Sequence, residues 1–127
     1  MGVSDTPDER PAVVRSAAYA GDALGAFAAV TRLEAVRGQD AYDALGELKV
    51  GTGVFAESFT SLTAALGRSL DVYDVRQDDG TDPALAIAKA SDYLNQAAPL
   101  LERVYALLDS AQTELGGQAA GPKKGTA

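Results

Sequence analysis

The segment whose residue types come closest to a cofactor site is Gly51-Thr52-Gly53-Val54-Phe55-Ala56. It has the GxGxxA form of a turn that binds a dinucleotide, and residues 48–50 could form the strand that precedes such a turn. That turn needs a βαβ unit, and no second strand signal follows at the required distance. We therefore expect no cofactor, and we keep a ligand- or nucleotide-binding turn at Gly51–Ala56 as an alternative.

The second candidate for chemistry is an acidic segment between residues 71 and 82. Its five carboxylates are those of Asp71, Asp74, Asp78, Asp79 and Asp82. Clustered oxygens of this kind bind hard cations such as Ca²⁺. The spacing does not fit an EF-hand loop, because the required acid is replaced by Val75. We expect a solvated helix end and loop rather than a metal site, and the sequence leaves cation binding by this segment open.

The amino-acid composition excludes most other kinds of catalytic site. The 127 residues include no Cys and no His, which excludes disulfides, thiolate nucleophiles, Ser-His triads and zinc sites with sulfur or imidazole ligands. Eighteen acidic and eleven basic residues give a net charge of -7, which repels phosphate backbones. We expect no catalytic residues, no enzyme activity and no binding of nucleic acid.

Neither a membrane span nor a targeting segment is evident. The longest weakly charged stretch, residues 16–31, has only 16 residues and contains Asp22, so it is too short and too polar to cross a bilayer. Residues 1–10 carry three acids and no apolar core, unlike a signal or transit peptide. Because the chain is rich in alanine and poor in lysine and isoleucine, it is typical of a G+C-rich coding sequence. These features favour the cytoplasm of a bacterium.

Three long segments have helical periodicity, and strand signals are poor. The first begins near residues 6–8 and runs to about Val36, where Gly38 stops it. The second runs from about Ala41 to Val75 with Asp40 as its cap, and the third begins at Pro83. We predict an all-α fold, an antiparallel bundle of three long helices in one domain at residues 8–115. Residues 1–7 are predicted to be a flexible N-terminus and residues 116–127 a disordered tail, because neither segment has an apolar anchor.

The second segment carries the longest apolar seam in the chain. Its members follow alternating steps of three and four residues: Leu45, Leu48, Thr52, Phe55, Phe59, Leu62, Leu66, Ser69 and Tyr73. This spacing predicts one continuous helix that packs along a heptad seam. Gly51 and Gly53 are its weak point, since each glycine costs roughly 1 kcal/mol relative to alanine.

The third segment repeats a large apolar residue every seven positions. These residues are Ile87, Leu94, Leu101, Leu108 and Leu115. They predict a helix with one buried face. Pro99 lies inside the pattern and removes one backbone hydrogen bond, so we expect a kink there, or a break near Asn95 that would give four helices instead of three.

Tyr105 and Asp109 stand four residues apart near the end of the third segment. This spacing resembles the Tyr-x-x-x-Asp signal of type VII secretion substrates, whose small members are Cys-free helical hairpins from G+C-rich bacteria. The companion Trp-x-Gly turn of that family is missing, because the chain has no Trp. The resemblance implies, as an alternative, a secreted helical protein.

Tyr93, Leu100 and Leu107 form a second apolar stripe on the third segment, beside the leucine seam. Three helices do not readily cover both stripes, and an apolar stripe left open is typical of an association surface. We therefore expect a helical protein that acts without catalysis, as an adaptor, assembly or accessory factor. It would bind a protein partner or a second copy of itself through Tyr93, Leu100 and Leu107, and it would be a homo-oligomer.

Overall fold

The computed structural model describes residues 7–124, and it contains three helices and no strand within that range. The helices are α1 (Ala12–Leu33), α2 (Gly38–Val72) and α3 (Pro83–Leu115). The predicted all-α fold is therefore confirmed. The chain divides into two units, Met1–Val36 with α1 and Arg37–Ala127 with α2 and α3, and each is described by itself. All but one residue of the predicted flexible N-terminus, and the last three residues of the predicted tail, lie outside the described residues.

Helix α1 is shorter at both ends than the sequence predicts. It begins at Ala12 rather than near residue 8, with Pro11 as an extended cap residue. The Asp8 carboxylate binds the Arg10 guanidinium at 2.7 Å instead of capping a helix. The residue before a proline is disfavoured in helical conformation, which explains the late start. At the other end Glu34 is extended, so the helix stops at Leu33.

Helix α2 is continuous through both of its central glycines, as predicted, and its 35 residues extend from Gly38 to Val72. Two details of its start differ from the prediction. Gly38 is the first residue of α2 rather than the stop of α1, and the Asp40 side chain makes no capping hydrogen bond. Asp40 instead pairs with Arg37 at 3.0 Å within the first turn. The helix ends three residues before the predicted Val75.

A ten-residue loop, residues 73–82, connects α2 to α3. Gly80 has a φ of 77°, a left-handed conformation that favours glycine, and its N–H donates to the Gln77 carbonyl at 3.0 Å. Asp82 then caps α3 by accepting a hydrogen bond from the Ala84 N–H at 3.0 Å, with Pro83 at the first helical position. The predicted loop and the predicted start of the third helix at Pro83 are both confirmed.

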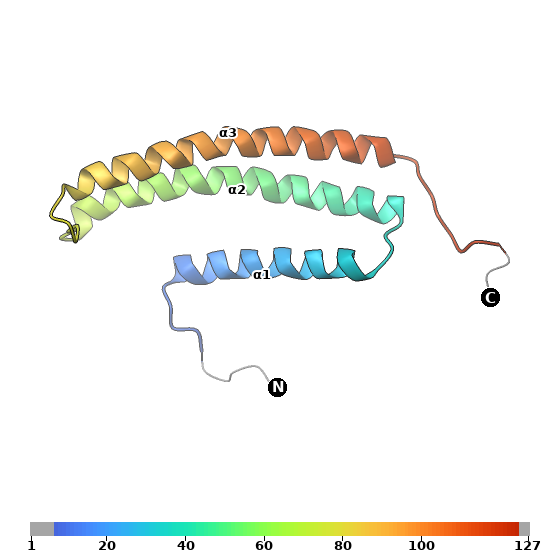
Figure 1. Cartoon of the computed structure of the whole chain (residues 1–127), viewed down its shortest axis with the longest axis horizontal. Coiled ribbons are helices and arrows are strands. Elements are labelled where there is room, and N and C mark those ends of the chain that lie inside the picture. Colours follow the sequence, from blue (N-terminus) through green and yellow to red (C-terminus); the bar gives the residue numbers. More distant parts are fainter. Residues whose placement is uncertain (1–6, 125–127) are drawn as a thin grey trace. The chain divides into compact units, whose positions relative to one another are not determined.

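Helix α3 remains one helix through Pro99, so the predicted alternative of a break and a fourth helix is wrong. Proline removes one hydrogen bond of the ladder, and the packing of α3 along α2 compensates for that loss. Figure 1 shows α2 and α3 running side by side and antiparallel from the loop to their far ends. The two helices form a hairpin, and this hairpin is the structural frame for the residues discussed below.

The predicted leucine seam of α3 faces α2. All five of its large residues are half-buried in the hairpin, where single helices would leave them exposed. The α2 seam is only partly used, since Leu45, Thr52 and Phe59 are half-buried whereas Phe55 and Leu62 are exposed. Among the described residues, no hydrophobic side chain is fully buried. A two-helix hairpin has one contact surface and cannot enclose a core.

The first residues after α3 contact the start of α2. The Ala120 N–H donates to the Gln39 side-chain oxygen at 2.8 Å. The Gln118 side chain lies directly over Gly38, where a Cβ atom would clash with it. Gly38 is the one buried residue of α2, and these contacts account for its burial.

Candidate interaction surface

The predicted interaction residues lie exposed along one side of α3. The side chains of Tyr93, Leu100 and Leu107 are 74%, 65% and 62% exposed. They stand two turns apart, on the edge of the helix beside the face that packs on α2. Val104, between them, is 42% exposed. The structure therefore brings the predicted residues into one row.

Helix α2 contributes further apolar side chains to the same surface. The side chains of Lys49 of α2 and Asp109 of α3 meet on one face of the hairpin, and this contact serves to tell the two faces apart. At 3.6 residues per turn, Leu62 lies on the side of α2 away from that face, and Leu100 lies on the side of α3 away from it. In an antiparallel hairpin these two sides form one surface. Phe55 lies two turns before Leu62 on the same side of α2, and the centre of its ring is 4.8 Å from that of Phe59.

We call this surface the apolar face. Its large members are Phe55, Leu62, Tyr93, Leu100, Val104 and Leu107. Each of them is between 39% and 74% exposed, which is high for side chains of this size and kind. Single exposed apolar residues are normal on a protein surface, but a contiguous row across two helices is typical of a binding surface.

The opposite face of the hairpin carries charged and small residues together with two exposed tyrosines, Tyr42 and Tyr105. The Lys49 ammonium donates to the Asp109 carboxylate at 2.7 Å and lies 5.6 Å from the centre of the Tyr105 ring. The hydrogen bond to Asp109 raises the pKa of Lys49 above its ordinary value. The two residues that resemble a secretion signal, Tyr105 and Asp109, therefore both contact Lys49. Their spacing is compatible with a role in helix packing.

A shallow groove of about 330 Å³ crosses this charged face. It is lined by small residues of both helices, including Gly53, Thr60 and Ala98, and by Glu57 and Glu102. Gly51–Ala56, predicted in one alternative to be a nucleotide-binding turn, is a regular part of helix α2. Neither the strand nor the turn that pyrophosphate binding requires is present in the described residues. The interpretation of this segment as a nucleotide-binding turn is therefore wrong.

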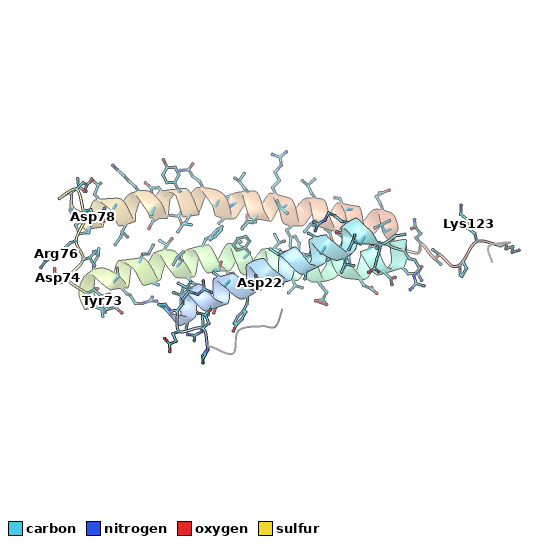
Figure 2. All side chains as sticks on the ribbon, turned by 60° about the horizontal axis from the view of Figure 1, so that its bottom comes forward. Asp22, Tyr73, Asp74, Arg76, Asp78 and Lys123 are labelled. Carbon is cyan, nitrogen blue, oxygen red and sulfur yellow. The ribbon has the colours of Figure 1, made fainter. Side chains whose placement is uncertain are left out.

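Three of the four acidic residues of the loop have local partners. Asp74 pairs with Arg76 at 2.9 Å, and Asp82 caps α3. Asp79 accepts hydrogen bonds from the Thr81 hydroxyl and N–H, which hold the pKa of Asp79 below its usual range. Figure 2 shows Asp74, Arg76 and Asp78 spread over the connection between α2 and α3. In residues 7–124, no three acidic side chains are grouped closely enough to bind a metal ion.

Phe55 and Leu62 are the members of the apolar face that sequence reasoning placed elsewhere. Their spacing assigned them to the seam that packs inside the bundle, whereas the structure leaves them 50% and 39% exposed. A signal was present in the width of the stripe. The seam residues from Leu45 to Ser69 spread over about 120° of the helix circumference at 3.6 residues per turn, and Phe55 and Leu62 lie toward one edge of that stripe.

Within the described part of the chain, no helix has both the length and the hydropathy that a membrane crossing requires. Comparison with protein families, with curated proteins and with solved structures gave no match to this chain.

Proposed function

We propose that this chain acts without catalysis, by presenting the apolar face of its hairpin to another protein molecule. The observation that carries the proposal is the row of exposed apolar side chains from Tyr93 to Leu107, extended across the hairpin by Phe55 and Leu62. Removing this surface from water on association is favourable, at roughly 25 cal/mol per Å² of apolar area. The role would be that of an adaptor, assembly or accessory factor in the bacterial cytoplasm.

The chemistry of the two faces supports this choice of surface. The six large residues of the apolar face include no ionised group, so covering them leaves no charge without water. The opposite face holds the Lys49–Asp109 ion pair and the carboxylates of Glu57 and Glu102. A partner that covered this second face would have to compensate those charges, which is costly in a dry interface.

Protection of a single thiol tests the proposal. Because the chain has no Cys, Leu100→Cys places one reactive thiol on the apolar face. We expect it to react slowly with a membrane-permeable maleimide inside producing cells, and quickly in the purified protein at nanomolar concentration. Asn95→Cys, exposed on the other face of α3, is the control and should react quickly in both settings. Equal, fast reaction of Leu100→Cys in both settings would contradict the proposal.

Export by a type VII-like route is a second proposal. Its support is the hairpin of two long helices with Tyr105 and Asp109 near the end of α3. The Lys49 contact allows a clean test, because Lys49→Met and Asp109→Asn both remove the ion pair. A secretion signal requires that Asp109→Asn abolish export of the intact chain while Lys49→Met preserves it. Equal export of both variants, or cytoplasmic retention of the wild type, would remove this proposal.

A further inference from the structure

The exposed edge of α3 carries a second heptad seam in which small and large residues alternate. Its central members are Ala90, Tyr93, Ala97, Leu100, Val104 and Leu107. The steps between them are three and four residues in strict alternation, which is the spacing by which one helix packs along another. The leucine seam on the adjacent face already packs on α2, so this second seam is available to another helix.

We propose that the occupant of the apolar face is a second copy of this chain, with α3 packed antiparallel against α3 of that copy. The two-fold axis passes at the level of residues 98 and 99. In this register Leu100 faces Ala97 of the second copy, Leu107 faces Ala90, and Tyr93 faces Val104. Every pair sets a larger side chain against a smaller one, which is how two helix surfaces interdigitate. A two-fold interface requires such self-complementarity.

The same two-fold rotation also pairs large with small residues on α2. The Lys49–Asp109 contact fixes the alignment within the hairpin, so that Thr60 of α2 lies level with Ala98 of α3. The axis that relates the α3 helices therefore passes α2 near residue 60. It sets Phe55 against Ala65 of the second copy and Leu62 against Ser58. Both helices thus pair large residues with small ones under one operator.

The size of the apolar face fits a stable dimer. Between residues 86 and 111 the seam is about 38 Å long at 1.5 Å per residue, and two helices side by side are roughly 20 Å wide. The product, roughly 750 Å², is close to the about 800 Å² that each partner contributes to a standard interface. None of the residue pairs named above is charged, although 23% of the chain is. Lys89 lies 18 residues, or five turns, before Leu107 on the same line of α3, and its long aliphatic stem lets the ammonium remain in water beside the contact.

This inference rests on the proposed function and names its partner, and crosslinking of single-cysteine variants tests it. Leu107→Cys is mixed with Ala90→Cys, and one of the two proteins carries a tag that changes its size. A short bis-maleimide should then link the two variants into a mixed dimer. Leu107→Cys alone should not crosslink to itself, since antiparallel pairing separates the two copies of residue 107 by 17 residues, or about 25 Å. Asn95→Cys mixed with Glu102→Cys is the matched control. The proposed axis also sets residue 95 level with residue 102 of the second copy, but both lie on the opposite face of the hairpin. This pair should not crosslink.

The possible failures separate the inference from the proposed function. Self-crosslinking of Leu107→Cys would show parallel pairing and overturn the register. No crosslinking, combined with fast maleimide reaction at position 107, would overturn self-pairing but leave an open face for a different protein. No crosslinking, combined with slow reaction in a monomer, would mean that the same chain covers the face, which would overturn both proposals.

Discussion

Lys49 of α2 and Asp109 of α3 stand 60 positions apart in the sequence, and their side chains meet at 2.7 Å. The Lys49 side chain is only 17% exposed, whereas that of Asp109 is 57% exposed. The lysine therefore lies along the hairpin, between the two helices, with its ammonium reaching the rim. This contact marks the alignment of α3 on α2, which decides the residues that share the apolar face.

Replacing Lys49 by Met should destabilise the hairpin at neutral pH and should do so less in strong base. The folded pKa of Lys49 lies above its value in the unfolded chain, because Asp109 accepts its hydrogen bond. The contact therefore stabilises fully below about pH 10.4 and is lost as pH rises through the folded pKa. Urea unfolding of wild type and Lys49→Met should show a gap in free energy that narrows above that pH. Arg68→Met, on the exposed outer side of α2, is the control, and a gap that stays constant up to pH 12 would contradict this contact.

Alanine at the central glycines of α2 should stabilise the protein. Nothing lies within 4 Å of the Cβ that would be added at Gly51 or Gly53, and both glycines are helical. Each substitution should add about 0.5–1 kcal/mol to the free energy of unfolding. Gly80→Ala is the contrast, because its φ of 77° is unfavourable for alanine, and it should lose about 1 kcal/mol. Thermal unfolding measures all three, and destabilisation by Gly51→Ala and Gly53→Ala would point to a turn rather than a helix.

Thr63→Val should also raise the stability of the hairpin. The Thr63 hydroxyl oxygen is buried and, in the described structure, has no hydrogen-bond partner. Removing an unsatisfied buried hydroxyl while keeping the shape of the side chain should gain about 1 kcal/mol. Thr63→Ser keeps the hydroxyl and loses a methyl group, so it should lose about 1 kcal/mol. If denaturant unfolding ranks the two variants in the reverse order, the hydroxyl has a partner.

The helices were predictable because their signals are local. Ile87, Leu94 and Leu101 repeat every seven residues, and that repeat alone assigns α3 and the face that it turns to α2. Continuity through Gly51 and Gly53 was likewise predictable, since the seam runs unbroken across both. The start of α2 at Gly38 was not, because it depends on a contact with the distant Gln118.

The apolar face was predictable only in part. Tyr93, Leu100 and Leu107 are visible in the sequence as a stripe that one neighbouring helix cannot cover. The contribution of Phe55 and Leu62 depends on how α2 is rotated against α3, and many weak side-chain contacts together set that rotation. The Lys49–Asp109 pair depends on the alignment of two helices across a ten-residue loop, and the spacing of charges along the chain does not encode that alignment.

Sedimentation velocity of wild type and Leu100→Asp tests the central claim, association through the apolar face, most directly. We expect the wild type to move as a species of twice its 13.0 kDa at micromolar concentration. The dissociation constant of the Leu100→Asp dimer should be about 100-fold higher than that of the wild type, since an unpaired carboxylate would be buried in the contact. Asn95→Asp adds the same charge to the opposite face and should sediment like the wild type. A 13.0 kDa wild type at every concentration, unchanged by Leu100→Asp, would contradict self-association through this face.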